Sequence, residues 1–156
     1  MMLKQKIFLI LFLITGAFSS CKKEEYNPEK QLAIDDALIK EFITKNSIVA
    51  IKHSSGLYYQ IITPGNGNAN FTNSTQVTVT YEGRLLNGSV FDKNTSGATF
   101  SLGNLITGWQ YGIPLIQPGG KIRLIIPSTL AYMDQARTGI PANAVLDFTI
   151  TLINAR

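Results

Sequence analysis

The stretch VTVTYEGRLLNGSVFD, residues 77–92, carries the clearest structural signal in the sequence. Apolar and polar residues alternate along its first half, which is the period of a β-strand with one buried face. Asn87-Gly88 follows, and this dipeptide favours a two-residue type I′ turn because both residues tolerate a positive φ. The stretch therefore predicts a β-hairpin.

The hairpin places the carboxylate of Asp92 on its apolar face. A two-residue turn pairs Gly83 with Asp92, two steps from Tyr81. An ionised carboxylate on an apolar face must accept hydrogen bonds or serve a functional site. The same register puts Phe91 on the opposite face unless a β-bulge turns it.

The rest of the chain after residue 46 supplies further strands and one short helix. Strands are expected over residues 56–62, 98–102, 121–126 and 144–153. Asn104 is suited to cap a short helix that contains Trp109, and Pro114 ends that helix.

Five segments resemble the FK506-binding-protein (FKBP) family of peptidyl-prolyl isomerases. They are VTVTYEGRLLNGSVFD, FSLGNLITGW, GGKIRLIIP, LAY and IPANAVLDFTITL, and they follow the family's order between residues 75 and 153. The resemblance implies an α+β fold in which a bent antiparallel sheet of about five strands wraps the short helix. One amphipathic N-terminal helix is expected before this domain.

The resemblance also implies a proline-binding pocket. Its expected substrate-binding residues are Tyr81, Phe91, Phe100, Leu105, Ile106, Trp109, Ile140 and Phe148. Trp109 matches the pocket floor of the family, and the Tyr132 hydroxyl matches the donor to the substrate carbonyl. Asp92 is expected to accept a hydrogen bond and organise the pocket rather than transfer protons. A purely structural, buried carboxylate is the alternative for Asp92. No cofactor is implied, and FK506-like macrolides are candidate ligands.

Three departures from the family pattern surround this pocket. Ala98 stands where the family often has an aromatic residue, and Met133 replaces the usual glycine after LAY. The loop over residues 133–138 lacks the usual glycine-rich, histidine-bearing or acidic pattern. The departures predict an altered rim, with slower catalysis or a different substrate choice.

Three functions are compatible with these features. The first is an isomerase that acts on proline-containing polypeptides and assists the folding of exported or envelope proteins. Uncatalysed isomerisation takes tens to hundreds of seconds, slow enough to limit folding. The second is a weakly active or inactive binding module or chaperone in an envelope complex, which the altered rim favours. The third is a structural component of such a complex, supported only by the N-terminal anchor described below.

The composition fits one domain with a short extension. Of 156 residues, 45% are hydrophobic and 15% charged, so a packed core is feasible. The net charge of +4 comes without a basic run longer than Lys22-Lys23, which gives nucleic-acid binding no support. His53, the only histidine, has no cysteine partner, and no metal site is expected.

The N-terminus predicts a bacterial lipoprotein signal peptide over residues 1–20. Two lysines precede an apolar run over residues 7–18, too short to span a bilayer comfortably, and two serines then precede Cys21. Residues 18–21 resemble a lipobox, which implies cleavage and acylation of Cys21, with palmitate among its acyl chains. An uncleaved membrane anchor and a free cysteine after ordinary secretion are the alternatives.

The mature protein is expected to have three parts. These are a lipidated tether over residues 21–27, an amphipathic helix over residues 28–46 and an FKBP-type isomerase domain over residues 47–156. The KKEE run at the start of the tether is either a solvated linker or a surface-export signal like that of some Bacteroidetes lipoproteins. The expected location is the bacterial cell envelope, lipid-anchored at the outer membrane and facing the periplasm or the cell surface.

The N-terminal helix has a clear start and a clear apolar row. Asn27 is its expected N-cap and Pro28 its first residue. The apolar stripe that we expect to pack against the domain consists of the i, i+4 row Ile34, Leu38 and Phe42, with Ala37, Ile39 and Ile43 beside it. Charged residues, Asp35 and Asp36 among them, take much of the remaining surface.

Overall fold

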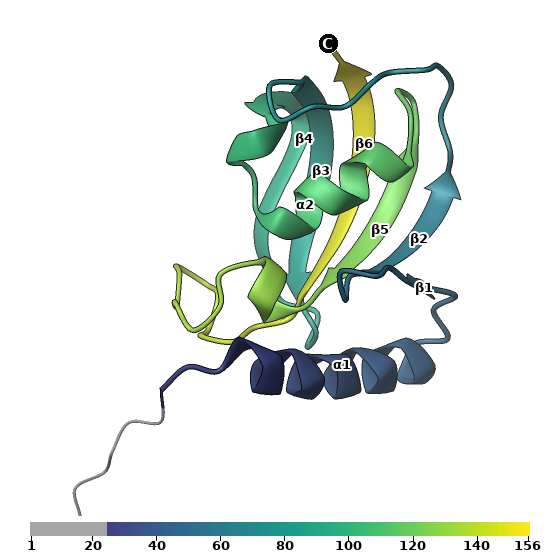
Figure 1. The fold of residues 1–156 in the computed structure, drawn as a ribbon. Coiled ribbons are helices and arrows are strands. Elements are labelled where there is room, and N and C mark those ends of the chain that lie inside the picture. Colours follow the sequence, from purple (N-terminus) through teal and green to yellow (C-terminus); the bar gives the residue numbers. More distant parts are fainter. Residues whose placement is uncertain (1–24) are drawn as a thin grey trace, which may run out of the picture.

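Six antiparallel strands form one sheet in the computed structural model of the protein, which describes residues 25–156 (Figure 1). They lie in the order β1-β2-β5-β6-β3-β4. Their bounds are β1 Ile51–Lys52, β2 Tyr58–Thr63, β3 Gln76–Leu85, β4 Val90–Ser101, β5 Lys121–Ile126 and β6 Leu146–Ala155. The expected α+β fold is confirmed, and the two-residue β1 is an additional strand at the edge of the sheet.

The expected signal peptide and Cys21 lie outside the described residues. In the part of the chain that the structure describes, no helix is long and apolar enough to cross a membrane. The lipid anchor and the envelope location therefore stay predictions.

The β3–β4 hairpin has the expected pairing but not the expected turn. Gly83 pairs with Asp92, as predicted. The Gly88 N–H donates to the Leu85 carbonyl at 2.9 Å, and Gly88, with a φ of 90°, is the only turn residue with a positive φ. The prediction of a type I′ turn is wrong, because that turn needs a positive φ at Asn87 as well.

A β-bulge in this hairpin turns Phe91. Gly83 pairs with Asp92 while Arg84 pairs with Val90, which leaves Phe91 as an extra residue on β4. A bulge of this kind re-aims a side chain that strict alternation would send to the other face. Phe91 and Asp92 therefore line the same cavity.

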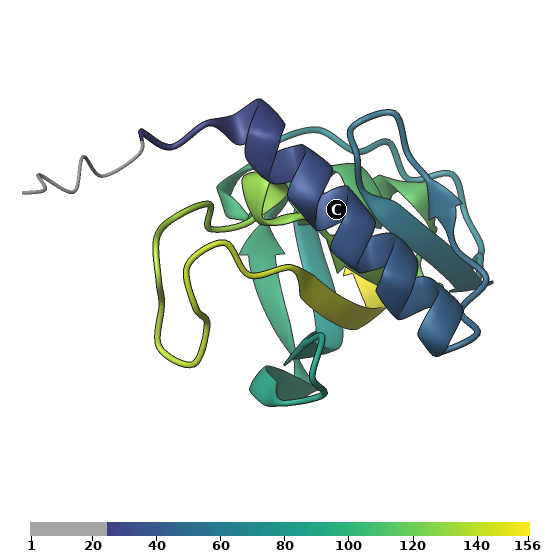
Figure 2. The ribbon, with the colours of Figure 1, turned by 90° about the horizontal axis from the view of Figure 1, so that it is seen from below.

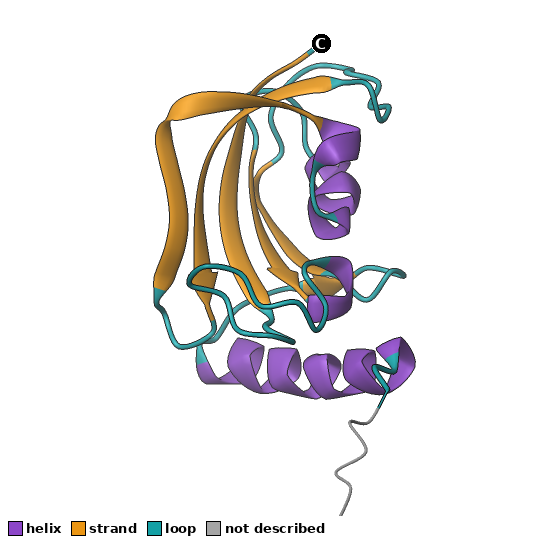
Figure 3. Ribbon diagram, turned by 90° about the vertical axis from the view of Figure 1, so that its left-hand side faces the viewer, coloured by secondary structure: helices purple, strands orange, loops and turns teal. Residues whose placement is uncertain are grey.

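The short helix α2, Thr107–Gly112, lies across the concave face of the sheet (Figure 3). It comes close to β5 because two glycines face that strand: a Cβ atom on Gly108 would overlap Ile126, and one on Gly112 would overlap Leu124. The fully buried core between helix and sheet contains Leu57, Val77, Val79, Ile113, Ile122, Leu124, Ile126, Leu146, Ile150 and Leu152. The 3₁₀ turns Leu102–Asn104 and Ile113–Leu115 flank the helix.

The N-terminal helix α1, Pro28–Lys45, lies across one end of the sheet (Figure 1 and Figure 2). Its start is as predicted, since the Asn27 side-chain oxygen accepts a hydrogen bond from the Lys30 N–H at 2.9 Å. Its predicted apolar stripe is wrong at Ile34 and Leu38, which are 46% and 44% exposed, whereas Ile39, Phe42 and Ile43 pack against the domain.

Asp35 and Ile39 are the buried positions of α1, each fully inaccessible; the burial of Ile39 fits the predicted stripe, and that of Asp35 contradicts its expected place on the charged surface. Ile39 packs in a second apolar cluster with residues such as Tyr58 and Ile125. Asp35 accepts hydrogen bonds from the Ser128 N–H at 2.7 Å and the Ser128 hydroxyl at 2.6 Å. These hydrogen bonds offset the free-energy cost of burying the carboxylate, so Asp35 can occupy the face of α1 that packs on the domain.

Candidate active site

One cavity of about 590 Å³ opens between α2, the β3–β4 hairpin and the loop that follows β5. The structure brings all ten predicted site residues to it: Tyr81, Phe91, Asp92, Phe100, Leu105, Ile106, Trp109, Tyr132, Ile140 and Phe148. Three further lining residues, Asn104, Arg137 and Thr138, were not predicted. The roles of these ten residues stay predictions, but the fold places all ten around one cavity.

Aromatic side chains form the floor and walls of the cavity. Trp109 is 4% exposed, and its ring centroid lies 5.2 Å from that of Tyr81 and 5.2 Å from that of Phe148. Both pairs are nearly perpendicular, at 78° and 88°, as the quadrupoles of aromatic rings favour. Phe91 meets Phe148 in the same way at 5.4 Å. The rings therefore hold one another in place.

Gly83 makes room for two of these rings. A Cβ atom at this position would lie 2.5 Å from Cε1 of Phe148 and 2.7 Å from Cζ of Phe91. Both distances are shorter than side-chain contacts tolerate, so any larger residue would push the rings apart. The glycine of the hairpin thus shapes the wall of the cavity.

Asp92 lies at the mouth of the cavity and is exposed, not buried. The Tyr81 hydroxyl donates a hydrogen bond to its Oδ2 at 2.8 Å. The burial of Tyr81 and this hydrogen bond raise the pKa of Tyr81 to about 12, so the phenol remains a donor at neutral pH. No ion pair engages Asp92 anywhere in residues 25–156, which leaves its carboxylate able to accept further hydrogen bonds.

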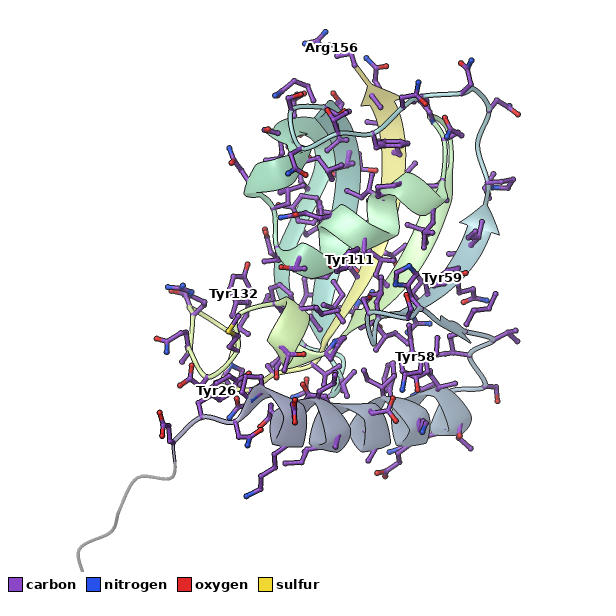
Figure 4. The ribbon with its side chains drawn as sticks, in the orientation of Figure 1. Tyr26, Tyr58, Tyr59, Tyr111, Tyr132 and Arg156 are labelled. Carbon is purple, nitrogen blue, oxygen red and sulfur yellow. The ribbon has the colours of Figure 1, made fainter. Side chains whose placement is uncertain are left out.

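Tyr132 reaches the cavity from the loop after the 3₁₀ turn Ser128–Leu130 (Figure 4). Ser128 connects this loop to α1 and to its own later part. Its N–H and hydroxyl donate hydrogen bonds to Asp35, and its carbonyl accepts one from the Met133 N–H at 2.9 Å. Met133 has a φ of 55°, a left-handed conformation that favours glycine. Helix α1 is thereby hydrogen-bonded to the segment that carries Tyr132.

A short antiparallel bridge brings Arg137 and Thr138 to the rim. The Arg137 N–H donates to the Ile140 carbonyl at 2.8 Å, and the Ile140 N–H donates back to the Arg137 carbonyl at 2.9 Å. No periodicity marks residues in such a loop as cavity residues. The only sequence signal was the departure of residues 133–138 from the family pattern.

The remaining titratable candidate lies elsewhere. His53 stacks on Tyr111 with ring centroids 5.7 Å apart, and its Nδ1 lies 2.9 Å from the Ser55 hydroxyl. No group of three His, Cys, Asp or Glu side chains suited to a metal ion occurs in the described range of 25–156. The cavity offers an apolar floor, one carboxylate, phenol hydroxyls and, at its rim, the guanidinium of Arg137.

Comparison with known proteins agrees with this geometry. The family model described as "FKBP-type peptidyl-prolyl cis-trans isomerase" matches residues 67–153. The FKBP-type peptidyl-prolyl cis-trans isomerase FkpA of Buchnera aphidicola is 38% identical over 141 residues, which are 88% of this chain and 56% of the relative.

Two solved structures have a similar fold. The crystal structure of FkpA from Escherichia coli superposes with a TM-score of 0.71 at 36% identity, over 83% of this chain and 62% of that one. A peptidyl-prolyl cis-trans isomerase from Pseudomonas syringae gives a TM-score of 0.67 at 29% identity, over 84% and 97%. The chain spans about half the length of the curated relatives it matches.

Proposed function

Because the chain belongs to the family of FKBP-type peptidyl-prolyl cis-trans isomerases, we propose that it catalyses cis-trans isomerisation of X–Pro bonds in polypeptides. The observation that carries the proposal is the cavity in which an aromatic floor, the Asp92 carboxylate and the Tyr132 side chain come together. The reaction needs no covalent intermediate, and none of the lining residues has to act as a nucleophile.

The physics of the bond fits such a cavity. Rotation about the peptide bond meets a barrier of about 18–20 kcal/mol, because resonance gives the C–N bond double-bond character. Resonance also places charge on the carbonyl oxygen and the nitrogen, and water stabilises that planar, polar form. An apolar aromatic cavity stabilises it less, which favours the twisted, less polar state in which rotation occurs.

Each part of the cavity has a proposed role. The floor around Trp109 accommodates the pyrrolidine ring, and the Tyr132 hydroxyl donates a hydrogen bond to the carbonyl of the residue before proline. Asp92 accepts hydrogen bonds and, through the Tyr81 hydroxyl at 2.8 Å, fixes the mouth of the cavity. These contacts are proposed to raise the rate because they hold the substrate in one reactive orientation. FK506-like macrolides are proposed ligands of the same cavity.

The proposed setting is the bacterial cell envelope. Exported or envelope proteins would be the clients, and an acylated Cys21 would anchor the protein at the outer membrane. Support comes from the basic, apolar and small-residue order of residues 1–20 and from the cysteine that follows. Slow prolyl isomerisation limits the folding of such clients, since it takes tens to hundreds of seconds.

A second candidate is a binding module or chaperone with little turnover. It is favoured by the altered rim: Met133 takes a left-handed φ of 55° in place of a glycine, and Ala98 does not line the cavity. A loop with this strain and composition differs from the family's at the place where a substrate would enter.

The test is cis-to-trans exchange, measured by NMR in a panel of X–Pro peptides with catalytic amounts of the purified protein. Acceleration is expected, and Tyr132→Phe and Trp109→Ala should each reduce it. Tyr111→Phe is the matched control, because Tyr111 is 45% exposed on α2 and does not line the cavity.

The same experiment separates the two candidates. No acceleration for any peptide, from a protein whose spectrum shows it to be folded, would reject the enzyme and leave the binding module. Equal losses in Tyr132→Phe and Tyr111→Phe would instead reject the assignment of the cavity as the catalytic site.

A further inference from the structure

Among residues 25–156, Arg137 is the only cationic side chain that lines the cavity. Its backbone is fixed by the two reciprocal hydrogen bonds with Ile140, at 2.8 and 2.9 Å. Ile140 is itself 6% exposed and belongs to the main core. The guanidinium is therefore presented at the rim from an anchored backbone position, although its own side chain is exposed.

The guanidinium has no carboxylate partner in the described part of the chain, residues 25–156. It lies over the ring of Tyr132, whose centroid is 5.6 Å from Cζ of Arg137. The other charged group of the cavity, Asp92, forms no ion pair with Arg137, and its Oδ2 accepts a hydrogen bond from the Tyr81 hydroxyl. In the same loop, Asp134 accepts a hydrogen bond from the Gln135 side chain at 2.8 Å. Arg137 thus retains the full capacity of its guanidinium for an external carboxylate.

The position of Arg137 indicates which part of a substrate it would meet. In the proposed function, on which this inference rests, the aromatic floor holds the proline ring and Tyr132 binds the carbonyl of the residue before it. A guanidinium over the ring of Tyr132 then lies beside the side chain of that preceding residue. Guanidinium groups bind carboxylates in a bidentate geometry that ammonium groups cannot reproduce.

We propose that Arg137 makes this site select prolyl peptides with an acidic residue immediately before the proline. Glu-Pro and Asp-Pro segments are the favoured substrates, and Lys-Pro and Arg-Pro segments are disfavoured by repulsion from the guanidinium. The selectivity resides in the loop over residues 133–138, the part of the chain that departs from the family pattern.

The experiment compares three peptides that differ only in X of X–Pro: Glu, Gln and Lys, in an otherwise uncharged sequence. NMR gives both the catalysed exchange rate and, from chemical-shift changes, the affinity. An exposed ion pair predicts that the Glu peptide exceeds the Gln peptide about threefold in kcat/KM or affinity at low salt. The ratio should shrink at 0.5 M salt, because salt screens exposed charges.

Variants locate the effect. Arg137→Gln should bring the Glu-to-Gln ratio to about one, Arg137→Lys should retain part of it, and Arg137→Glu should reverse the order of Glu and Lys. Lys121→Gln is the matched control, because it removes an equal charge from an exposed position of β5 outside the cavity.

The outcomes distinguish this inference from the proposed function. Equal rates and affinities for Glu and Gln peptides, or a ratio that survives Arg137→Gln, would overturn the role of Arg137 even in an active enzyme. Tighter binding of the Glu peptide without acceleration would overturn the isomerase and uphold the selectivity. Absence of both binding and acceleration for all three peptides would overturn both.

Discussion

Two tyrosine–aspartate pairs of the molecule have the same hydrogen bond in different surroundings. Tyr81 donates to Asp92 at the mouth of the cavity, and Tyr58 donates to Asp36 on α1, each at 2.8 Å (Figure 4 shows Tyr58 beside the helix). Burial and the hydrogen bond raise the pKa of each tyrosine to about 12. The hydrogen-bond distance and the pKa of the tyrosine are therefore the same in the two pairs.

The carboxylates differ. Asp36 also binds the ammonium groups of Lys40 at 2.7 Å and Lys52 at 2.6 Å, and hydrogen bonds from these two lysines hold its pKa well below the ordinary value. Asp92 has no cation bound to it within residues 25–156. A carboxylate whose charge is already paired fastens α1 to the sheet. One whose charge is unpaired, at the mouth of an apolar cavity, retains capacity for a ligand.

The largest effect expected from this comparison is on catalysis. Asp92→Ala should lower kcat/KM for X–Pro peptides about thirtyfold, because the mouth of the cavity loses the carboxylate that accepts hydrogen bonds there. The matched Asp36→Ala should leave kcat/KM unchanged, since Asp36 does not line the cavity. NMR exchange on one peptide with each variant provides the measurement. A comparable loss of kcat/KM in Asp92→Ala and Asp36→Ala would contradict the view that the Tyr81–Asp92 pair is functional and the Tyr58–Asp36 pair structural.

The next effect is on stability and its dependence on pH. Asp36→Asn should lower the free energy of unfolding by about 1 kcal/mol, because it removes two exposed lysine pairs. The folded carboxyl has a pKa below its unfolded value of about 4, so its contribution is present above that pH and is lost as the pH falls further.

Denaturant unfolding between pH 2 and pH 7 measures both quantities. The stability of Asp36→Asn should fall less steeply below pH 4 than that of the unaltered protein. Parallel profiles for the unaltered protein and Asp36→Asn would show that the lysine pairs contribute nothing to folding.

Local signals explain what the sequence predicted of these two regions. Alternation and Asn87-Gly88 act over a few residues, so the hairpin and the pairing of Gly83 with Asp92 were predictable. The turn type was not, because Asn87 does not take the positive φ that it tolerates. The start of α1 was predictable for the same reason, since Asn27 caps a helix through a contact three residues away.

Distant partners explain what was missed. Asp35 was expected on the polar surface, but its partner Ser128 lies 93 positions along the chain and satisfies its charge in the interior. Hydrophobic periodicity along α1 contains no information on a partner so distant in the sequence. Ile34 and Leu38 were therefore assigned to the buried face of the helix, although they are exposed. Arg137 reached the cavity only through its bridge to Ile140. The family resemblance located the aromatic residues because the matching segments follow the family's order, and it did so both in the strands and α2 and, for Tyr132, in a loop.

The smallest effect comes from removing one hydroxyl from each pair. Tyr58→Phe and Tyr81→Phe should each lower the free energy of unfolding by about 1 kcal/mol, the usual contribution of a hydrogen bond to a protein. Both folded phenols have a pKa of about 12, above the unfolded value of about 10. Their contribution is therefore present below pH 10 and is lost as the pH rises toward 12, and each substitution should flatten that loss.

Activity at neutral pH separates the two hydroxyls. Tyr81→Phe should reduce kcat/KM about twofold, because water can take the place of the phenol beside the exposed Asp92 carboxylate. Tyr58→Phe should leave kcat/KM unchanged, because Asp36 retains both lysines. If Tyr81→Phe were as active as the unaltered protein while Asp92→Ala remained impaired, the carboxylate would act on the substrate directly. If Tyr58→Phe and Tyr81→Phe lost activity equally, the order of the cavity would depend on the attachment of α1 to the sheet. The unpaired carboxylate of Asp92 would then not explain the activity.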